Sequence, residues 1–151
     1  MTIAVAPARK RRKRAAIYIL DEQVGFLLRQ VNQRHAVLFA ERMGADMTTT
    51  QWAALSKLRE KGPCSQNLLG RMTAMDAATI KGVIDRLSKR GLTETRPDPE
   101  DARCLLVDLT EAGRQTVDAA AAAALEVSEE TLAPLSPEER QVFLDVLKKL
   151  R

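Results

Sequence analysis

Residues 65–90 of the chain read SQNLLGRMTAMDAATIKGVIDRLSKR. Ser65 is a favourable N-cap residue, so the stretch predicts a short helix that begins directly after it. A second helix is predicted from Asp76 to Arg90, and Gly91 supplies its C-terminal stop. The apolar residues of this second helix repeat at helical spacing and form one stripe, made of Ile80, Val83, Ile84 and Leu87. The stretch therefore predicts two helices joined by a tight turn.

The segment behind these helices predicts a β-hairpin. Residues 92–96 and 103–109 alternate between polar and apolar side chains, as strands do. The connection at residues 97–102 reads PDPEDA, which is rich in turn formers, and its prolines have no N–H to donate to a ladder. Helix, turn, helix and hairpin in this order are typical of a winged helix-turn-helix. There the second helix enters the major groove of DNA, and a charged hairpin tip suits the neighbouring backbone or minor groove.

Two further helices are predicted on the N-terminal side. Apolar residues at helical spacing indicate a first helix over about residues 17–43. Residues 48–51 read TTTQ and offer N-cap candidates for the next helix. The glycine and proline at residues 62–63 end that helix.

Two helices are also predicted after the hairpin. A long one opens at residues 110–111, runs through the alanines of residues 119–124, and ends before Pro134. The last helix begins with Ser136 as N-cap and Pro137 at its first position. The predicted fold class is therefore mainly α with a small β-hairpin wing.

The length of 151 residues fits one domain. We expect that domain to span residues 17–151, with the winged helix-turn-helix at about 48–110. The helices at about 17–43 and 111–151 lie outside the DNA-binding segment, and a chain this short has few surfaces of its own to cover them. We interpret them as dimerisation helices of a two-fold homodimer. The alternative is a bundle closed within one chain.

Charge is distributed unevenly along the chain. The formal net charge is +4, but residues 9–14 read RKRRKR and supply six positive charges, which leaves −2 for the remainder. Residues 65–96 hold six basic and three acidic side chains, whereas residues 97–151 hold six basic and twelve acidic ones. This asymmetry is expected when one face meets phosphate. Residues 1–16 are predicted to be a disordered basic tail that contacts DNA, or else a solvated arm without a partner.

Other classes of protein lack support in the sequence. No apolar run approaches the ~20 residues of a membrane span, and no apolar segment of the kind found in a secretory signal follows the basic block. Cys64 and Cys104 fit neither a disulfide framework nor metal-ligand spacing, so we expect a reducing, cytoplasmic setting. There is no phosphate-binding loop or nucleophile elbow. We therefore expect no enzyme activity, no cofactor and no metal.

The sequence resembles MarR-type winged helix-turn-helix regulators over roughly residues 17–151. The resemblance is carried by TIKGVIDRLSKRGL at residues 79–92, DPEDAR at 98–103 and VDLTEAG at 107–113. It implies a homodimeric transcriptional repressor that binds a pseudo-palindromic operator in double-stranded DNA. More narrowly, the chain resembles members that repress genes for the catabolism of aromatic or N-heteroaromatic acids, such as nicotinate.

The resemblance assigns a role to two residues of the hairpin. It implies that Arg103 enters the minor groove and that Asp101 holds its guanidinium in place. The physics agrees, because a narrow minor groove attracts a planar cation and a carboxylate fixes it in a bidentate pair. The alternative is an exposed salt bridge worth about 0–1 kcal/mol. Ala102 stands where relatives commonly carry an arginine, which implies fewer wing contacts.

The predicted recognition helix offers several polar or small residues outside its apolar stripe. Thr79 can contact a base edge, and Lys81 and Arg86 can reach guanine or phosphate. Gly82 stands where many relatives have a large polar or basic residue. Because glycine inside a helix costs about 1 kcal/mol relative to alanine, it calls for close approach to DNA or tight helix packing. The predicted DNA-binding set is Ser65, Asp76, Ala78, Thr79, Lys81, Gly82, Arg86, Asp101 and Arg103.

The resemblance also implies a small, often anionic aromatic effector bound between the dimerisation helices and the DNA-binding segment. His35, the only histidine, lies on the apolar stripe of the first helix, one turn before Phe39. Arg34 and Arg42 flank that stripe, and Trp52 opens the second helix. An aromatic wall, an imidazole and a cation suit a flat carboxylate. The alternative is that His35 is a partly buried, hydrogen-bonded core residue and that Trp52 is an ordinary core anchor.

Three functional hypotheses follow. The first is a homodimeric repressor that a small aromatic carboxylate, such as a nicotinate derivative, releases from DNA. The second is a regulator switched by oxidation of Cys64 or Cys104. The third is a winged-helix module that binds protein or RNA, which the basic tail would suit equally well.

Overall fold

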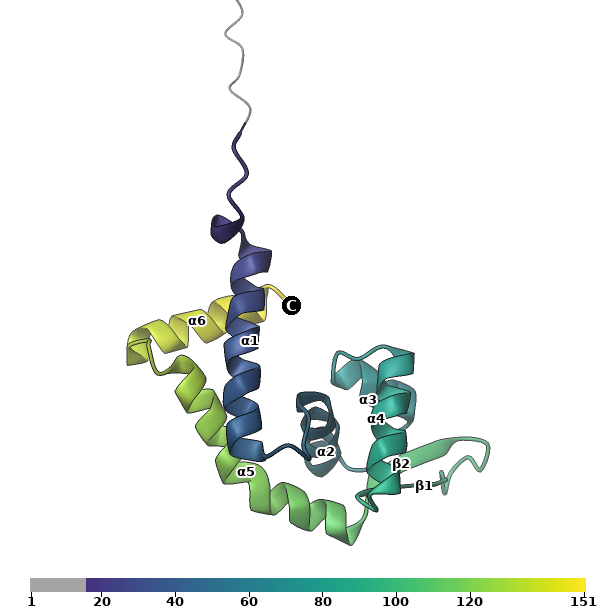
Figure 1. The fold of residues 1–151 in the computed structure, drawn as a ribbon. Helices are drawn as coiled ribbons and strands as arrows, with labels where there is room; N and C mark the ends of the chain where they lie inside the picture. The colour runs from purple at the N-terminus through teal and green to yellow at the C-terminus, as the bar shows by residue number, and fades with distance from the viewer. Residues whose placement is uncertain (1–15) are drawn as a thin grey trace, which may run out of the picture.

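The computed structural model describes residues 16–151, so the predicted basic tail lies outside the described residues except for Ala16. Within them the chain forms six α-helices, a short 3-10 helix and one antiparallel hairpin (Figure 1). The predicted mainly-α architecture with a β-hairpin wing is confirmed. The elements are η1 (Leu20–Glu22), α1 (Val24–Met43), α2 (Thr49–Lys61), α3 (Gln66–Met72), α4 (Ala77–Lys89), β1 (Thr93–Pro97), β2 (Leu105–Leu109), α5 (Glu111–Leu132) and α6 (Pro137–Lys149).

The helices begin where the sequence offers capping side chains. Thr48 and Ser136 each form a reciprocal capping box with the residue three positions later. Ser65 accepts a hydrogen bond from the backbone of Leu68, and Asp76 accepts one from the backbone of Thr79. Each cap satisfies a donor that the first helical turn leaves unpaired. The predicted starts of α2, α3, α4 and α6 are therefore confirmed.

A glycine ends α4 as predicted. Gly91 has φ +71°, a conformation that side chains disfavour. Its N–H bonds to the carbonyl of Ser88, and the N–H of Leu92 bonds to the carbonyl of Leu87. These two bonds form a Schellman motif. The motif turns the chain directly from α4 into β1.

Two predicted boundaries are wrong. The first helix begins at Val24 rather than near residue 17, because Gln23 is extended and separates η1 from α1. Ile17 and Tyr18 are 87% and 73% exposed, so among residues 16–151 their apolar side chains find no surface against which a helix could pack. The second strand begins at Leu105 rather than at residue 103.

The shorter second strand has a local cause. The carboxylate of Asp101 accepts the backbone N–H of Arg103, and its carbonyl accepts the backbone N–H of Cys104. Both N–H groups are thus taken by the turn, so the ladder closes only at the pair Pro97–Leu105. The first strand accordingly ends at Pro97, at the edge of the hairpin, where no N–H is required.

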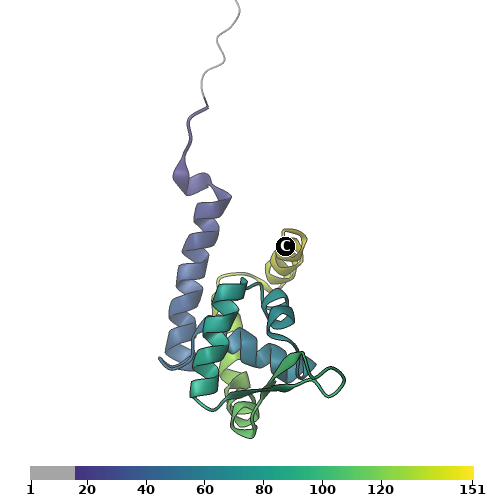
Figure 2. The same ribbon diagram turned by 90° about the vertical axis from the view of Figure 1, so that its right-hand side faces the viewer.

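The core lies between α2, α3, α4, the hairpin and α5, and it extends to Phe39 of α1. The predicted apolar stripe of α4 is buried, since Ile80, Val83, Ile84 and Leu87 are at most 3% exposed. Leu55, Leu58, Leu69 and Leu109 complete the centre of this core. Figure 2 shows α4 across the front of the module and the hairpin projecting away from it. The buried stripe leaves the opposite face of α4 in solvent.

The remaining helices form a second, more open part. Helix α5 packs along α1, and α6 follows α5 and crosses α1 in the view of Figure 1 but lies apart from it in the view of Figure 2. Large apolar side chains on these helices stay exposed, among them Val24, Leu125, Val142 and Leu150. No helix among residues 16–151 combines the length and the apolar character needed to cross a bilayer.

The segment formed by α4 and the hairpin joins α5 through an unusually close contact. An added Cβ at Gly113 would lie 2.1 Å from the carbonyl oxygen of Leu92. The backbone N–H of Thr110 bonds to that same carbonyl, and the Thr110 hydroxyl bonds to the carbonyl of Gly91. Only glycine allows the first turn of α5 to pack this closely on the end of α4.

Replacement of Gly113 by alanine should therefore separate α5 from the turn at Leu92, between α4 and β1. We expect Gly113→Ala to lower the free energy of unfolding by about 3 kcal/mol, because backbone atoms must move. Gly25→Ala is the control, since nothing lies within 4 Å of an added Cβ there. Urea denaturation of both variants tests this, and equal stability of the two would contradict the proposed packing constraint.

Candidate nucleic-acid interface and ligand site

The solvent-facing side of α4 holds the predicted contact residues. Ala78, Thr79, Lys81 and Arg86 are exposed, and Gly82 is half-buried. Asp76 instead serves as the N-cap, and its hydrogen bond from the backbone of Thr79 lowers the pKa of the Asp76 carboxyl. The cap fixes where the helix begins and so which residues face outward.

The cations of α4 differ in their partners. Lys81 Nζ lies 2.7 Å from the carboxylate of Asp85, and this contact lowers the pKa of the Asp85 carboxyl. Arg90 donates to the carbonyl of Asp46 and, more weakly, to the Gln51 side chain. No ion pair or hydrogen bond to another described residue engages the guanidinium of Arg86. Arg86 is thus the arginine on this helix whose donors remain available.

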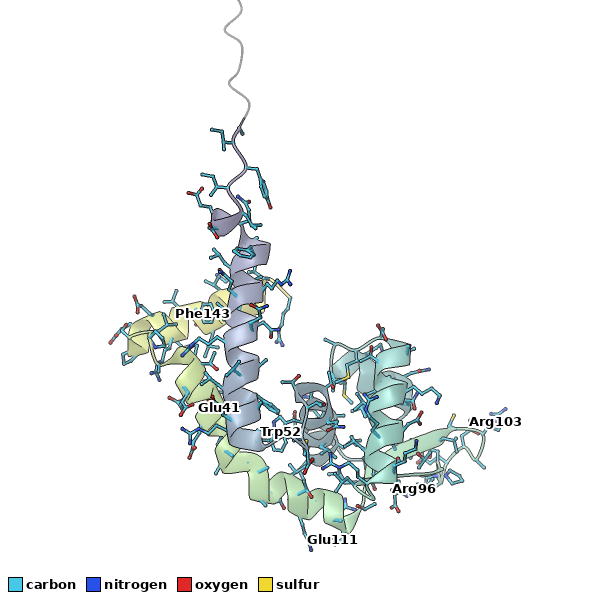
Figure 3. The ribbon with its side chains drawn as sticks, viewed as in Figure 1. Glu41, Trp52, Arg96, Arg103, Glu111 and Phe143 are labelled. Atoms are coloured by element: carbon cyan, nitrogen blue, oxygen red, sulfur yellow. The ribbon has the colours of Figure 1, made fainter. Side chains whose placement is uncertain are left out.

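The hairpin tip presents a fixed guanidinium. Arg103 Nε and Nη2 donate to the two carboxylate oxygens of Asp101 at 3.0 and 3.2 Å. Arg103 is 90% exposed at its side chain, and Figure 3 shows it at the far end of the hairpin. The paired guanidinium lowers the pKa of the Asp101 carboxyl. Such an exposed pair adds little stability, so its effect is to hold the cation in one orientation.

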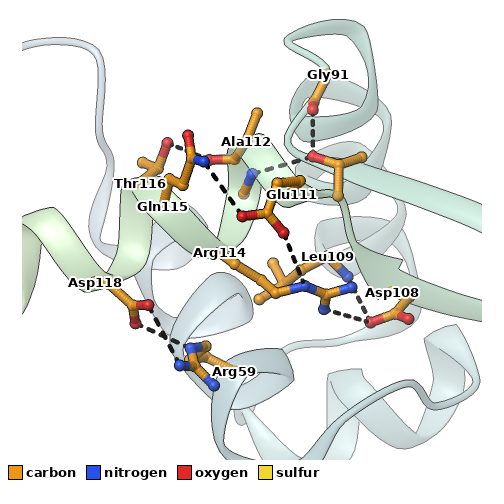
Figure 4. Close-up of polar contacts among 12 residues, drawn as sticks. Arg59, Gly91, Asp108, Leu109, Glu111, Ala112, Arg114, Gln115, Thr116 and Asp118 are labelled. Carbon is orange, nitrogen blue, oxygen red and sulfur yellow. Dashed lines mark hydrogen bonds and ion pairs between the residues drawn. The ribbon is translucent and has the colours of Figure 1, made fainter.

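A buried carboxylate at the base of the hairpin was missed by the sequence reasoning. The Asp108 side chain is only 10% exposed and lies 3.3 Å from Arg96. It also lies 3.7 Å from Arg114, a contact that Figure 4 shows. It also accepts the backbone N–H of Leu109 at 2.7 Å. A charged residue between two apolar positions of one strand was the available signal. Asp108 links β1, β2 and α5.

Three of the five predicted ligand residues hold α1 against α5. Arg34 donates to the backbone carbonyls of Thr131 and Glu130 at 2.6 and 2.8 Å. His35 Nδ1 lies 2.8 Å from the hydroxyl of Thr131. Arg42 pairs with Glu126 and with Glu130. The cations expected to meet an anionic ligand therefore already have partners in this chain.

Two open cavities border α5. One of about 490 Å³ lies between α1, α5 and α6, and its lining includes Leu28, His35 and Phe143. Another of about 460 Å³ lies between α2 and α5, and its lining includes Trp52 and Arg59. His35 and Trp52 thus face separate cavities, which have Ser128 in common, and Arg34, Phe39 and Arg42 line neither.

The α2–α5 cavity has polar groups that the sequence reasoning did not single out. The hydroxyl of Ser56 is buried and has no hydrogen-bond partner among the described residues. At the rim, Arg59 donates to both carboxylate oxygens of Asp118, at 2.9 and 3.3 Å (Figure 4). These hydrogen bonds lower the pKa of the Asp118 carboxyl. Their signal was weak, because serine and arginine on a predicted helix are common.

Neither cysteine is placed in a setting that activates thiols. Burial and the charge of Asp108 raise the pKa of Cys64, and the nearby Asp101 carboxylate raises the pKa of Cys104. A raised pKa lowers the fraction of thiolate, which is the reactive form. Among residues 16–151, no three His, Cys, Asp or Glu side chains are arranged to hold a metal ion.

The thiol chemistry of Cys104 is directly testable. In a Cys64→Ser background, the pH midpoint for alkylation of Cys104 by iodoacetamide should lie above that of a free cysteine. Asp101→Asn should shift the midpoint down, because the raising charge is removed. A midpoint below that of free cysteine would favour the oxidation-sensing hypothesis instead.

A buried helical scaffold, an outward face of α4 and an arginine-tipped hairpin define a winged helix-turn-helix DNA-binding protein. Residues 47–105 match the MarR family. The HTH-type transcriptional repressor NicR of Pseudomonas putida is 40% identical over 134 residues, which cover 88% of this chain and 85% of NicR. The chain therefore belongs to the MarR family of transcriptional regulators.

Solved structures agree with this assignment. A probable transcriptional regulator from Pseudomonas aeruginosa is 56% identical, with a TM-score of 0.86 over 88% of this chain and 100% of that chain. BpsR of Bordetella bronchiseptica, whose DNA binding is regulated by 6-hydroxynicotinic acid, is 38% identical, with a TM-score of 0.85 over 89% and 97% of the two chains. The predicted family and fold are confirmed.

The wing can be tested by removing its guanidinium. Arg103→Ala should weaken binding to specific DNA about tenfold, the loss of one charge-assisted contact. Circular dichroism should remain unchanged, because the side chain is exposed. Lys149→Ala is the control, since it removes the same charge from the far end of α6. Equal affinity of Arg103→Ala and the wild type in fluorescence anisotropy would refute the wing assignment.

Proposed function

We propose that this protein is a homodimeric transcriptional repressor that binds a pseudo-palindromic operator and is released by a small aromatic carboxylate related to nicotinate. The observation that carries the proposal is the pairing of an exposed α4 face with a fixed, solvent-exposed Arg103 in one rigid module. The identity to the repressor NicR and the likeness to BpsR support the direction of regulation and the class of effector.

A second copy of the chain is the proposed partner. Apolar side chains on α1, α5 and α6 remain exposed in the single chain, including Val24, Leu125 and Val142. In a monomer this apolar surface stays in contact with water, which is unfavourable, whereas a two-fold dimer buries it. Two copies of α4 then reach successive major grooves about 34 Å apart. Paired half-sites give the dimer its affinity.

The DNA contacts are divided between three elements. Ser65 and Asp76 cap α3 and α4 and set their orientation, and Arg103, held by Asp101, enters the minor groove. From α4 we assign base-edge or phosphate contacts to the outward residues Ala78, Thr79, Lys81, Gly82 and Arg86.

The effector is assigned to the surface of α5 that both cavities share. Trp52 offers a flat face at one side of Ser128, and His35 offers an imidazole at the other. Arg59 lies at the rim beside Trp52, and a carboxylate ligand would have to compete with Asp118 for it. Arg34, Phe39 and Arg42 support the wall without lining either cavity. A ligand there releases DNA only if it binds better to a dimer whose two α4 helices no longer match the grooves.

Specific DNA binding is the first test. A labelled duplex from upstream of the protein's own gene should bind with an affinity that survives an excess of unrelated duplex. If unrelated duplex and structured RNA compete equally well for the protein, the result would instead support a nucleic-acid-binding module without operator specificity. Sedimentation of the complex should give two chains per operator.

The effector is tested with the chain's only tryptophan. Titration with 6-hydroxynicotinate or nicotinate should change Trp52 emission, corrected for ligand absorbance, and release operator DNA over the same concentration range. Nicotinamide is the matched control, because it keeps the ring and lacks the carboxylate. Release by nicotinamide at the same concentration would show that the carboxylate is not recognised.

A further inference from the structure

We infer that Arg86 reads a guanine in each operator half-site and that Gly82 provides the seat from which it does so. This rests on the proposed function and specifies which base the centre of α4 recognises. The proposed site consists of two residues one helical turn apart, Gly82 and Arg86.

The geometry places the guanidinium of Arg86 over the backbone of Gly82. An added Cβ at Gly82 would lie 3.4 Å from Nη1, 3.8 Å from Nη2 and 3.9 Å from Cζ of Arg86. The side chain therefore runs back along the helix toward its N-terminus, as long helical side chains do. The head group of residue 86 thus occupies the outward position of residue 82.

Among the described residues, no neighbour other than Arg86 restricts the size of the side chain at position 82. Within 4 Å of the added Cβ, the three nearest described atoms all belong to the head group of Arg86. At Gly113, by contrast, the backbone of Leu92 leaves no room for a side chain. A long side chain at residue 82 would occupy the place of the Arg86 head group, whereas a small residue leaves room for a flat cation against the backbone of α4.

The donors of Arg86 have no partner among residues 16–151, unlike those of Lys81 and Arg90. Lys81 is paired with Asp85, and Arg90 is bound to the loop before α2. A guanidinium presents donors in a planar fork. The matching pattern in the major groove is the pair of acceptors N7 and O6 on guanine. A phosphate would also accept these donors, but it carries no base identity.

The experiment measures base discrimination rather than affinity alone. Each G·C pair of the mapped operator is replaced symmetrically by A·T, or its guanine by 7-deazaguanine, and binding is followed by anisotropy. The wild type should lose about 5- to 150-fold in affinity at one symmetric pair of positions. Arg86→Lys should bind the intact operator more weakly and lose most of that discrimination.

Two substitutions at Gly82 test the seat itself. Gly82→Ala should keep the discrimination and raise the melting temperature, because a Cβ at 3.4 Å is an ordinary contact and alanine favours the helix. Gly82→Leu fills the seat, so it should reduce discrimination as much as Arg86→Lys. The double variant should be no worse than either single one. Circular dichroism confirms that each variant is folded.

The outcomes separate this inference from the proposed function. If the wild type shows no operator preference, the proposed function fails. If the wild type is specific and Arg86→Lys or Gly82→Leu discriminates equally well, only the inference is overturned. Uniform weakening on all sequences, with the salt slope reduced by about 1, would identify a phosphate contact and also overturn it. Lys89→Ala is the reference for such a phosphate-type change on the same helix.

Discussion

The contact between Gly113 and the carbonyl of Leu92 sets the geometry on which the other parts depend. It brings the first turn of α5 onto the end of α4, where two hydrogen bonds from Thr110 and the buried Asp108 reinforce it. Helix α4, the hairpin and the start of α5 therefore behave as one body. Because α5 continues for 22 residues to the far side of α1, any rotation of that helix moves the recognition helix with it.

The other end of α5 is held by polar contacts of a different kind. Arg34 binds its last carbonyls, His35 meets Thr131, and Arg42 pairs with Glu126 and Glu130. These contacts lie near solvent and can exchange partners, whereas the Gly113 contact is made by backbone and cannot. The cavity lined by His35 lies along this part of α5, whereas the cavity lined by Trp52 extends from Ser128 back to Val117. Helix α5 is thus rigidly fixed where it meets the DNA-binding module and adjustable where a ligand would bind.

The sequence predicted the ends of helices correctly where a helix end depends only on residues close by in the chain. Caps such as Thr48 and Ser136, and the stop at Gly91, act within a few residues, so their positions were read directly. The spacing of Ile17 and Leu20 suggested a longer first helix, but a helix also needs a surface for its apolar side, and the single chain provides none.

The ligand residues show the corresponding limit for sites. Helical spacing correctly grouped Arg34, His35 and Phe39 near one face of α1, but the rotation of α1 against α5 decides which of them meets a cavity. That rotation depends on packing far along the chain. Asp108 and Ser56 could not be predicted for the same reason. Asp108 matters because Arg96 and Arg114 on other elements pair with it, and Ser56 because its buried hydroxyl has no hydrogen-bond partner among the described residues.

Pairing across helices also determines where positive charge remains available. The acidic C-terminal third supplies partners for cations on other elements, such as Asp118 for Arg59 and Glu130 for Arg42. On the recognition helix the one acidic neighbour, Asp85, is taken by Lys81. Arg86 and the tip residue Arg103 are left pointing outward, the first over a glycine and the second fixed by Asp101. The acidic helices therefore do more than balance net charge, because they concentrate accessible cations on the face that meets DNA.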